Sequence, residues 1–198
     1  MDTWRPQLYL CNTYGHVYTS LILAWHRQLF DGTRATIAIA FTRNFYDRSF
    51  LERLRTVPWI DVIELDVWAT VRHIEGMNVL KRLLINQFIG TLYPRVDPSV
   101  RSLPSLENHD LRLFNDFHYV ARWALRCAPR PVTMVEDGFN NYVPAPRRLR
   151  YLVSELLGIY PNYGRHPRVD RILVQRPEDL PPDVKLKGAP LPLRDLLE

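Results

Sequence analysis

Short apolar runs alternate along the chain with longer segments in which apolar residues recur at helical spacing. ATIAIAFT is apolar almost throughout, which is typical of a strand buried on both faces of a sheet. VYTSLILAWHRQLF instead places apolar residues on one side of a helix. Strands are predicted at 7–13, 35–42, 59–67, 110–115, 131–136 and 169–177. Helices are predicted at 17–30, 49–57, 71–92, 117–128 and 147–158, with a Pro- and Ser-rich loop at 94–108.

This alternation predicts an α/β fold, with a mainly parallel sheet and helices on both faces. Ser49 and Glu52 have the spacing of a capping box, so Ser49 is expected to cap the second helix. Tyr93-Pro94 is expected to end the third helix, because the residue before a proline disfavours helical geometry.

Three polar clusters follow predicted strands at their carboxyl ends, where open parallel sheets bind ligands. The clusters contain Asn12, Thr13, Tyr14 and His16 after the first strand, Asn115, Asp116 and His118 after the fourth, and Glu136, Asp137 and Gly138 after the fifth. Each cluster also has a local explanation as a helix cap or a glycine turn. Their convergence on one edge of the sheet favours a binding site.

The stretch VEDGFNNY places two adjacent carboxylates directly after an apolar run. Burying a carboxylate is unfavourable, and two neighbouring negative charges repel each other. The stretch is therefore either a solvated turn or a functional site. Its place at the end of a predicted strand favours a site.

The composition is that of a globular domain with an excess of arginine. The chain has 198 residues, of which 46% are hydrophobic and 24% charged, and its formal net charge is +5. Lysine occurs three times, so 26 − 3 = 23 of the basic residues are arginine, which suits contacts with phosphates and carboxylates. Solvated helix surfaces explain the same excess, so the charge indicates a partner only weakly.

Several classes of protein are not supported by the sequence. Cys11 and Cys127 lie far apart, which argues against a disulfide scaffold and fits a cytoplasmic location. Neither a membrane span nor a signal peptide is predicted. The common phosphate-binding loops, HExxH, GxSxG, Asp-x-Asp and RNA-binding motifs are absent. No metal, resident cofactor or nucleic-acid partner is therefore expected.

Four ordered segments resemble the N-terminal half of bacterial sialyltransferases and polysialyltransferases of glycosyltransferase families 52 and 38. They are CNTYGH (11–16), LFNDFHYVARW (113–123), VEDGFNNY (135–142) and LLGIYPNYGRHPRVDRILVQRPEDLP (156–181). The third resembles the family's acidic-acidic-Gly motif with a downstream tyrosine, and the fourth resembles its interdomain segment. The resemblance covers nearly the whole chain and implies a Rossmann-like N-terminal domain of the two-domain GT-B architecture.

The resemblance also implies an activity, which is transfer of sialic acid from CMP-sialic acid to a glycan acceptor hydroxyl, with inversion and without a metal. One acid of the motif would be the general base, and a histidine in a second domain would contact the donor phosphate. We expect Glu136 as the base and Asp137 as its support, although the sequence leaves their order open. The residues expected to bind substrate are Asn12, Thr13, Tyr14, His16, Asn115, Asp116, Gly138 and Tyr142.

Two features depart from the family pattern. His166-Pro167 lies in the expected interdomain connector, so we interpret it as a loop rather than as the family's donor-binding His-Pro motif. The chain is also about half the usual family length, which suggests a truncated protein. We expect an acceptor-side domain at 1–165 and, at 166–198, a connector toward a donor-binding domain.

Two alternatives remain open at this point. The donor could be another CMP-activated acid sugar such as Kdo, or the chain could be a non-catalytic glycan-binding or assembly domain. The basic composition, with tryptophan and tyrosine, is also compatible with peripheral contact at the inner face of a membrane. An exposed interdomain face would favour self-association into a homo-oligomer.

Overall fold

The computed structural model describes residues 5–40, 47–142 and 164–192 of the chain. Its strands are β1 Gln7–Cys11, β2 Ala35–Ile39, β3 Ile60–Glu64, β4 Asp110–Leu113, β5 Val132–Val135, β6 Val169–Val174 and β7 Gly188–Pro190. All seven pair in parallel in one sheet, in the order β3-β2-β1-β4-β5-β6-β7. The fold is α/β and Rossmann-like, which confirms the predicted class.

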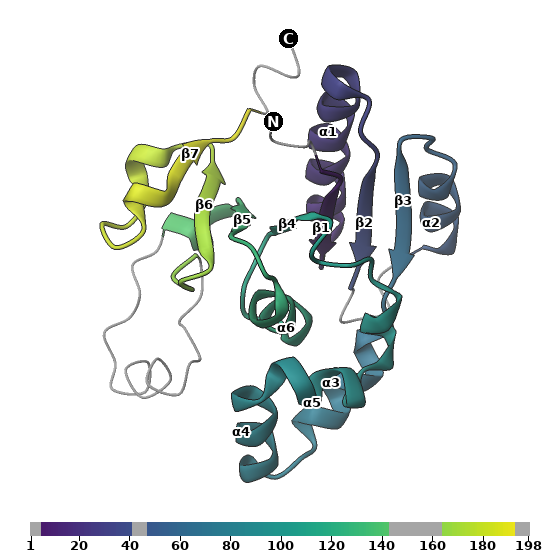
Figure 1. The fold of residues 1–198 in the computed structure, drawn as a ribbon, viewed down its shortest axis with the longest axis vertical. Coiled ribbons are helices and arrows are strands. Elements are labelled where there is room, and N and C mark those ends of the chain that lie inside the picture. The colour runs from purple at the N-terminus through teal and green to yellow at the C-terminus, as the bar shows by residue number, and fades with distance from the viewer. Residues whose placement is uncertain (1–4, 41–46, 143–163, 193–198) are drawn as a thin grey trace.

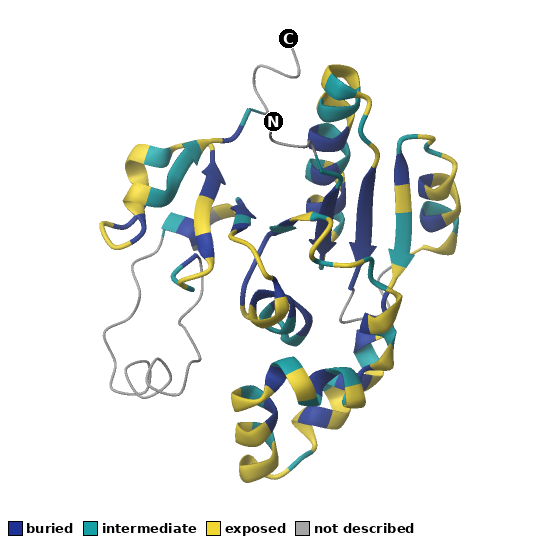
Figure 2. Ribbon diagram, viewed as in Figure 1, coloured by how far each residue is buried: buried dark blue, intermediate teal, exposed yellow. Residues whose placement is uncertain are grey.

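Helices cover both faces of this sheet, and each face has its own hydrophobic core. The helices are α1 Tyr14–Asp31, α2 Arg48–Arg55, α3 Val67–Glu75, α4 Val79–Gln87, α5 Ile89–Val96 and α6 Tyr119–Cys127 (Figure 1). Leu8 and Leu10 of β1 belong to the same buried cluster as residues of α3 to α6. Tyr9 and Cys11 belong to a second cluster with residues of α1 and α2. Every residue of β1 and β2 is therefore buried (Figure 2).

The strand order reverses between β1 and β4. From β1 the chain proceeds outward to β2 and β3, then returns to place β4 on the other side of β1. The connections leaving these two neighbouring strands therefore diverge to opposite sides, and sheets of this kind bind ligands at the carboxyl ends of such strands. The clusters after Cys11 and after Leu113 lie at these carboxyl ends, as the sequence predicted.

The prediction of one long helix at 71–92 is wrong, because the chain forms three shorter helices there. α3 ends with Gly76 as its C-cap, and α4 begins after Asn78, whose side chain accepts a hydrogen bond from the Lys81 backbone N–H at 2.9 Å. Glycine has a low helix propensity, and asparagine satisfies a free N–H of the next helix. A local stop and start signal thus outweighs the continuous apolar pattern.

Pro94 also behaves differently from the prediction, since it lies inside α5. A proline there cannot donate to the carbonyl of Gly90 four residues earlier. The Cys127 thiol approaches that carbonyl at 3.8 Å. The loop predicted at 94–108 is likewise only partly a loop, because a 3-10 helix spans Pro98–Ser102.

The predicted N-cap of the second helix, Ser49, is wrong, because the helix begins two residues earlier. Asp47 is the N-cap of α2, and its carboxylate accepts a hydrogen bond from the Ser49 backbone N–H at 2.9 Å. A carboxylate at this position also interacts favourably with the positive end of the helix dipole.

The C-terminal part of the described chain belongs to the same sheet. The strand predicted at 169–177 ends at Val174, and Gly188–Pro190 adds an edge strand that the sequence did not indicate. The segment 166–198, expected as a connector, thus supplies β6 and β7. The helix predicted at 147–158 lies outside the described residues.

Candidate functional site

The first residue of the site is His16, which the N-terminus of α1 holds in a defined orientation. The Thr13 hydroxyl accepts the His16 backbone N–H at 3.2 Å and caps the helix. The imidazole stacks on the buried ring of Phe114, with 4.3 Å between ring centroids and 5° between planes. The Asn12 backbone N–H donates to His16 Nδ1 at 3.1 Å. Because Nδ1 accepts, the proton of the neutral ring lies on Nε2.

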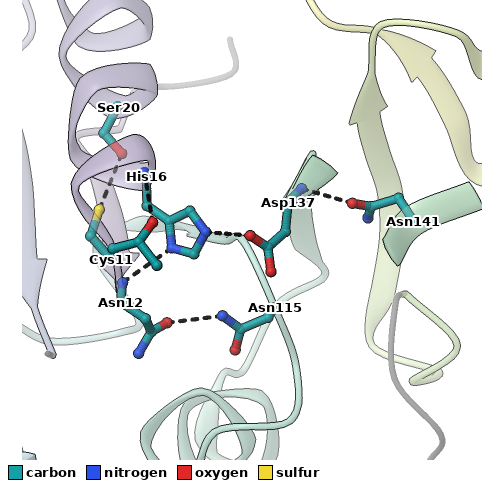
Figure 3. Close-up of polar contacts among 8 residues, drawn as sticks. Cys11, Asn12, His16, Ser20, Asn115, Asp137 and Asn141 are labelled. Carbon is teal, nitrogen blue, oxygen red and sulfur yellow. Dashed lines mark hydrogen bonds and ion pairs between the residues drawn. The ribbon is translucent and has the colours of Figure 1, made fainter. Parts of the chain in front are cut away.

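That Nε2–H faces Asp137, which lies 121 positions later in the chain. The distance from His16 Nε2 to Asp137 Oδ1 is 2.6 Å (Figure 3). The backbone N–H of Asp137 donates to Asn141 Oδ1 at 2.7 Å, and Gly138 provides the expected turn with a positive φ of 71°. The Asp137 side chain retains 21% of its exposure. The carboxylate is thus held at one oxygen and remains accessible.

The neighbouring acid, Glu136, faces a different environment. Its carboxylate accepts hydrogen bonds from the Tyr142 hydroxyl at 3.1 Å and from the Gln175 backbone N–H at 2.6 Å. The Arg176 backbone N–H donates to the same tyrosine oxygen at 3.2 Å. Glu136 therefore ties the end of β5 to the chain after β6. Separate hydrogen-bond partners for the two acids offset the repulsion that their adjacency implies.

A cavity of about 570 Å³ opens beside Glu136 rather than beside His16. The residues that line it are Glu136, Gly138, Tyr142, Gln175, Arg176 and Asp179. Two expected binding residues, Gly138 and Tyr142, thus border the Glu136 side of the motif.

Asn12 and Asn115 link the segments that follow β1 and β4. Asn115 Nδ2 donates to Asn12 Oδ1 at 3.1 Å (Figure 3). Asn12 Nδ2 in turn donates to the Ala40 carbonyl at 3.1 Å. Asn115 is 2% exposed, and its Oδ1 has no hydrogen-bond partner among the described residues. These amides hold the loops around His16 in place.

Three of the expected binding residues make contacts within the scaffold. Thr13 is the helix cap, as described above. The Tyr14 hydroxyl accepts the Asp47 backbone N–H at 2.9 Å, so this side chain reaches toward α2 rather than toward the acids. Asp116 is buried and accepts the Gly164 backbone N–H at 3.0 Å. It does not cap α6, whose N-cap is His118.

His118 is a member of this site that the sequence placed in a polar cluster but not among the binding residues. Burial, together with the nearby His16, lowers its pKa from 6.5 to about 4, and the Asp137 charge opposes that shift. His118 is therefore a neutral imidazole at pH 7. Its position two residues after Asp116, in the segment that follows β4, is the signal that could have identified it.

A pH dependence of stability follows from this environment. Between pH 6.5 and about 4 the unfolded chain protonates His118 while the folded chain does not, so stability falls as the pH falls through this window. The full shift corresponds to at most about 3 kcal/mol. Urea unfolding at several pH values should show a shallower dependence for His118→Gln than for the native chain. Equal slopes would contradict the assignment.

The chemistry available to the site is that of a positioned carboxylate. No group of three or more metal-ligating side chains occurs among the described residues. Burial raises the pKa of Cys11 to about 12, so its thiol is not a nucleophile at neutral pH. Asp137 is thus the group best placed to accept a proton, with His16 as its hydrogen-bond donor.

No protein-family model matches the chain, and neither a curated protein nor a solved structure matches it. In the described part of the chain, no helix is long and apolar enough to cross a membrane.

Proposed function

We propose that this chain is the acceptor-side domain of an inverting, metal-independent glycosyltransferase, with Asp137 as the general base. The observation that carries the proposal is the accessible Asp137 carboxylate, held by His16 at the carboxyl edge of a parallel sheet. A sugar hydroxyl is a weak nucleophile, and a fixed carboxylate can take its proton as the new bond forms.

In this mechanism the two acids have the opposite roles from those expected from the sequence. The supporting acid should bind backbone, and that acid is Glu136, which accepts the Gln175 N–H. The acid that contacts His16 and remains partly exposed is Asp137. His16 Nε2–H donates to one of its oxygens, which leaves the other oxygen to receive the acceptor proton. The hydroxyl oxygen then attacks the anomeric carbon, and the bond to the leaving phosphate breaks.

The donor that we propose is CMP-sialic acid, and the acceptor is a glycan. The resemblance of VEDGFNNY and its companion segments to sialyltransferases supports this choice. The leaving group would be CMP, whose single phosphate can depart with help from cationic or hydrogen-bonding side chains instead of a metal. CMP-Kdo is the alternative donor, because Kdo is also an acidic sugar and its leaving group is also CMP.

The test is a transfer assay on the protein in its full natural length, with EDTA present. CMP-sialic acid is offered with galactose-terminated and sialic acid-terminated acceptors, and CMP-Kdo is offered in parallel. Product from CMP-sialic acid is the expected result. Product from CMP-Kdo alone would change the donor and keep the mechanism. If neither donor gives product but the protein still binds glycans, the chain is a glycan-binding domain and not part of a transferase.

A further inference from the structure

Helix α4 carries its apolar residues on the side that faces away from the protein. A surface helix usually packs an apolar stripe on the core and turns polar residues outward. In α4 only Ile85 is buried, whereas Leu80 is 72% exposed and Leu84 is 54% exposed. The exposed apolar side chains on α4 and at its C-cap are Val79, Leu80, Leu83, Leu84 and Phe88.

The charges around this face are mainly positive. On α4 both charged residues are basic, Lys81 and Arg82, and from Glu75 to Glu107 the other basic residues are Arg95 and Arg101, with Glu75, Asp97 and Glu107 as the acids. Glu75 and Glu107, which lie outside α4, are exposed. Asp97 is 1% exposed, and it accepts the Tyr93 hydroxyl at 2.7 Å. It therefore contributes little to the outer surface. Lys81 and Arg82 lie on α4 itself, next to the exposed leucines.

The position of α4 relates this face to the rest of the fold. The helices α3, α4 and α5 gather at one end of the molecule, and the arrowheads of β2 and β3 point toward that end (Figure 1). Figure 2 shows that α4 is exposed over most of its surface. A flat surface could therefore contact α4 at the end of the molecule toward which these strands run.

We propose that the α4 face docks on an anionic lipid surface. A short helix with exposed leucines and flanking cations matches the pattern of interfacial helices, whose apolar residues enter the boundary between headgroups and acyl chains. Each basic residue near such a surface adds attraction to anionic headgroups. A second copy of the chain is a poorer occupant, because two α4 faces in contact would bring Lys81 and Arg82 of both copies together. The inference is independent of the proposed transferase activity.

Vesicle co-sedimentation tests this inference on the unmodified chain. Vesicles of phosphatidylcholine mixed with phosphatidylglycerol should bind the protein, and added salt should weaken that binding. Vesicles of phosphatidylcholine alone should bind it far less. Lys81→Glu combined with Arg82→Glu should weaken binding to the anionic vesicles by roughly tenfold or more. Leu80→Ser combined with Leu84→Ser should also weaken binding, without unfolding the protein, because both side chains are exposed.

Matched control variants separate the α4 face from general properties of the protein. Arg53→Glu with Lys185→Glu changes the net charge equally, from +5 to 5 − 4 = +1, at exposed positions outside α4. Leu29→Ser with Leu186→Ser removes two exposed leucines elsewhere. Both controls should bind vesicles like the native chain. Equal losses in control and α4 variants would overturn the proposal. So would self-association that Leu80→Ser and Leu84→Ser abolish in a protein that binds no vesicles.

Discussion

Replacing Asp137 with asparagine is expected to reduce glycosyl transfer by roughly 10²- to 10⁴-fold, the range in which a general base contributes. The amide cannot take the acceptor proton, yet its oxygen can still accept the hydrogen bond from His16 Nε2–H, now 2.6 Å from Oδ1. The Asp137 backbone N–H still bonds to Asn141. The fold and the local turn should therefore survive, and the loss should appear in kcat more than in the acceptor KM.

Glu136→Gln is the matched variant, since it makes the same chemical change one residue earlier. Its amide oxygen can still accept the Gln175 backbone N–H, so transfer should fall much less than in Asp137→Asn. Urea unfolding of both variants checks that the folded state is retained. The reverse order of effects, with Glu136→Gln the more damaging, would restore the assignment made from the sequence. Near-normal turnover in both would remove the acidic motif from the mechanism.

The general position of this site could be predicted from the sequence because it depends on local patterns. Apolar runs mark the strands, and polar residues at their carboxyl ends mark the edge where a parallel sheet binds ligands. Asn12, His16, Asn115 and Asp137 lie together for this reason. Successive residues of an extended chain point to opposite sides, so the sequence also indicates that Glu136 and Asp137 have different surroundings. Which of the two contacts His16 depends on the fold.

The roles of other polar residues depend on partners that are distant in the sequence. Asp116 is occupied by Gly164, 48 residues later, and Tyr14 by Asp47, 33 residues later. Nothing in the local pattern around either residue distinguishes a scaffold contact from a binding contact. The break between α3 and α4 is different, because Gly76 and Asn78 are local signals in the sequence. Here they outweigh the continuous apolar pattern.

Gly164→Ala is expected to destabilise the fold by about 3 kcal/mol, because two costs add at this position. Gly164 has a φ of +85°, a conformation that costs an alanine roughly 1 kcal/mol or more. An added Cβ would also lie 2.4 Å from Ile172 Cδ1 and 3.0 Å from its Cγ1. Ile172 is fully buried in β6, so it has little room to move. Such overpacking typically costs a further 1–3 kcal/mol.

Gly32→Ala is the control that separates the two costs. Gly32 has a φ of +71° at the end of α1, but an added Cβ there would meet nothing within 4 Å. Gly32→Ala should therefore lower the free energy of unfolding only by the roughly 1 kcal/mol that the backbone conformation costs. Urea unfolding of both variants gives the difference, which we expect to be about 2 kcal/mol. Equal losses would show that the chain around Gly164 relaxes freely. That result would also weaken the assignment of Asp116 to the scaffold, because its carboxylate would then bind a backbone N–H that is not fixed in place.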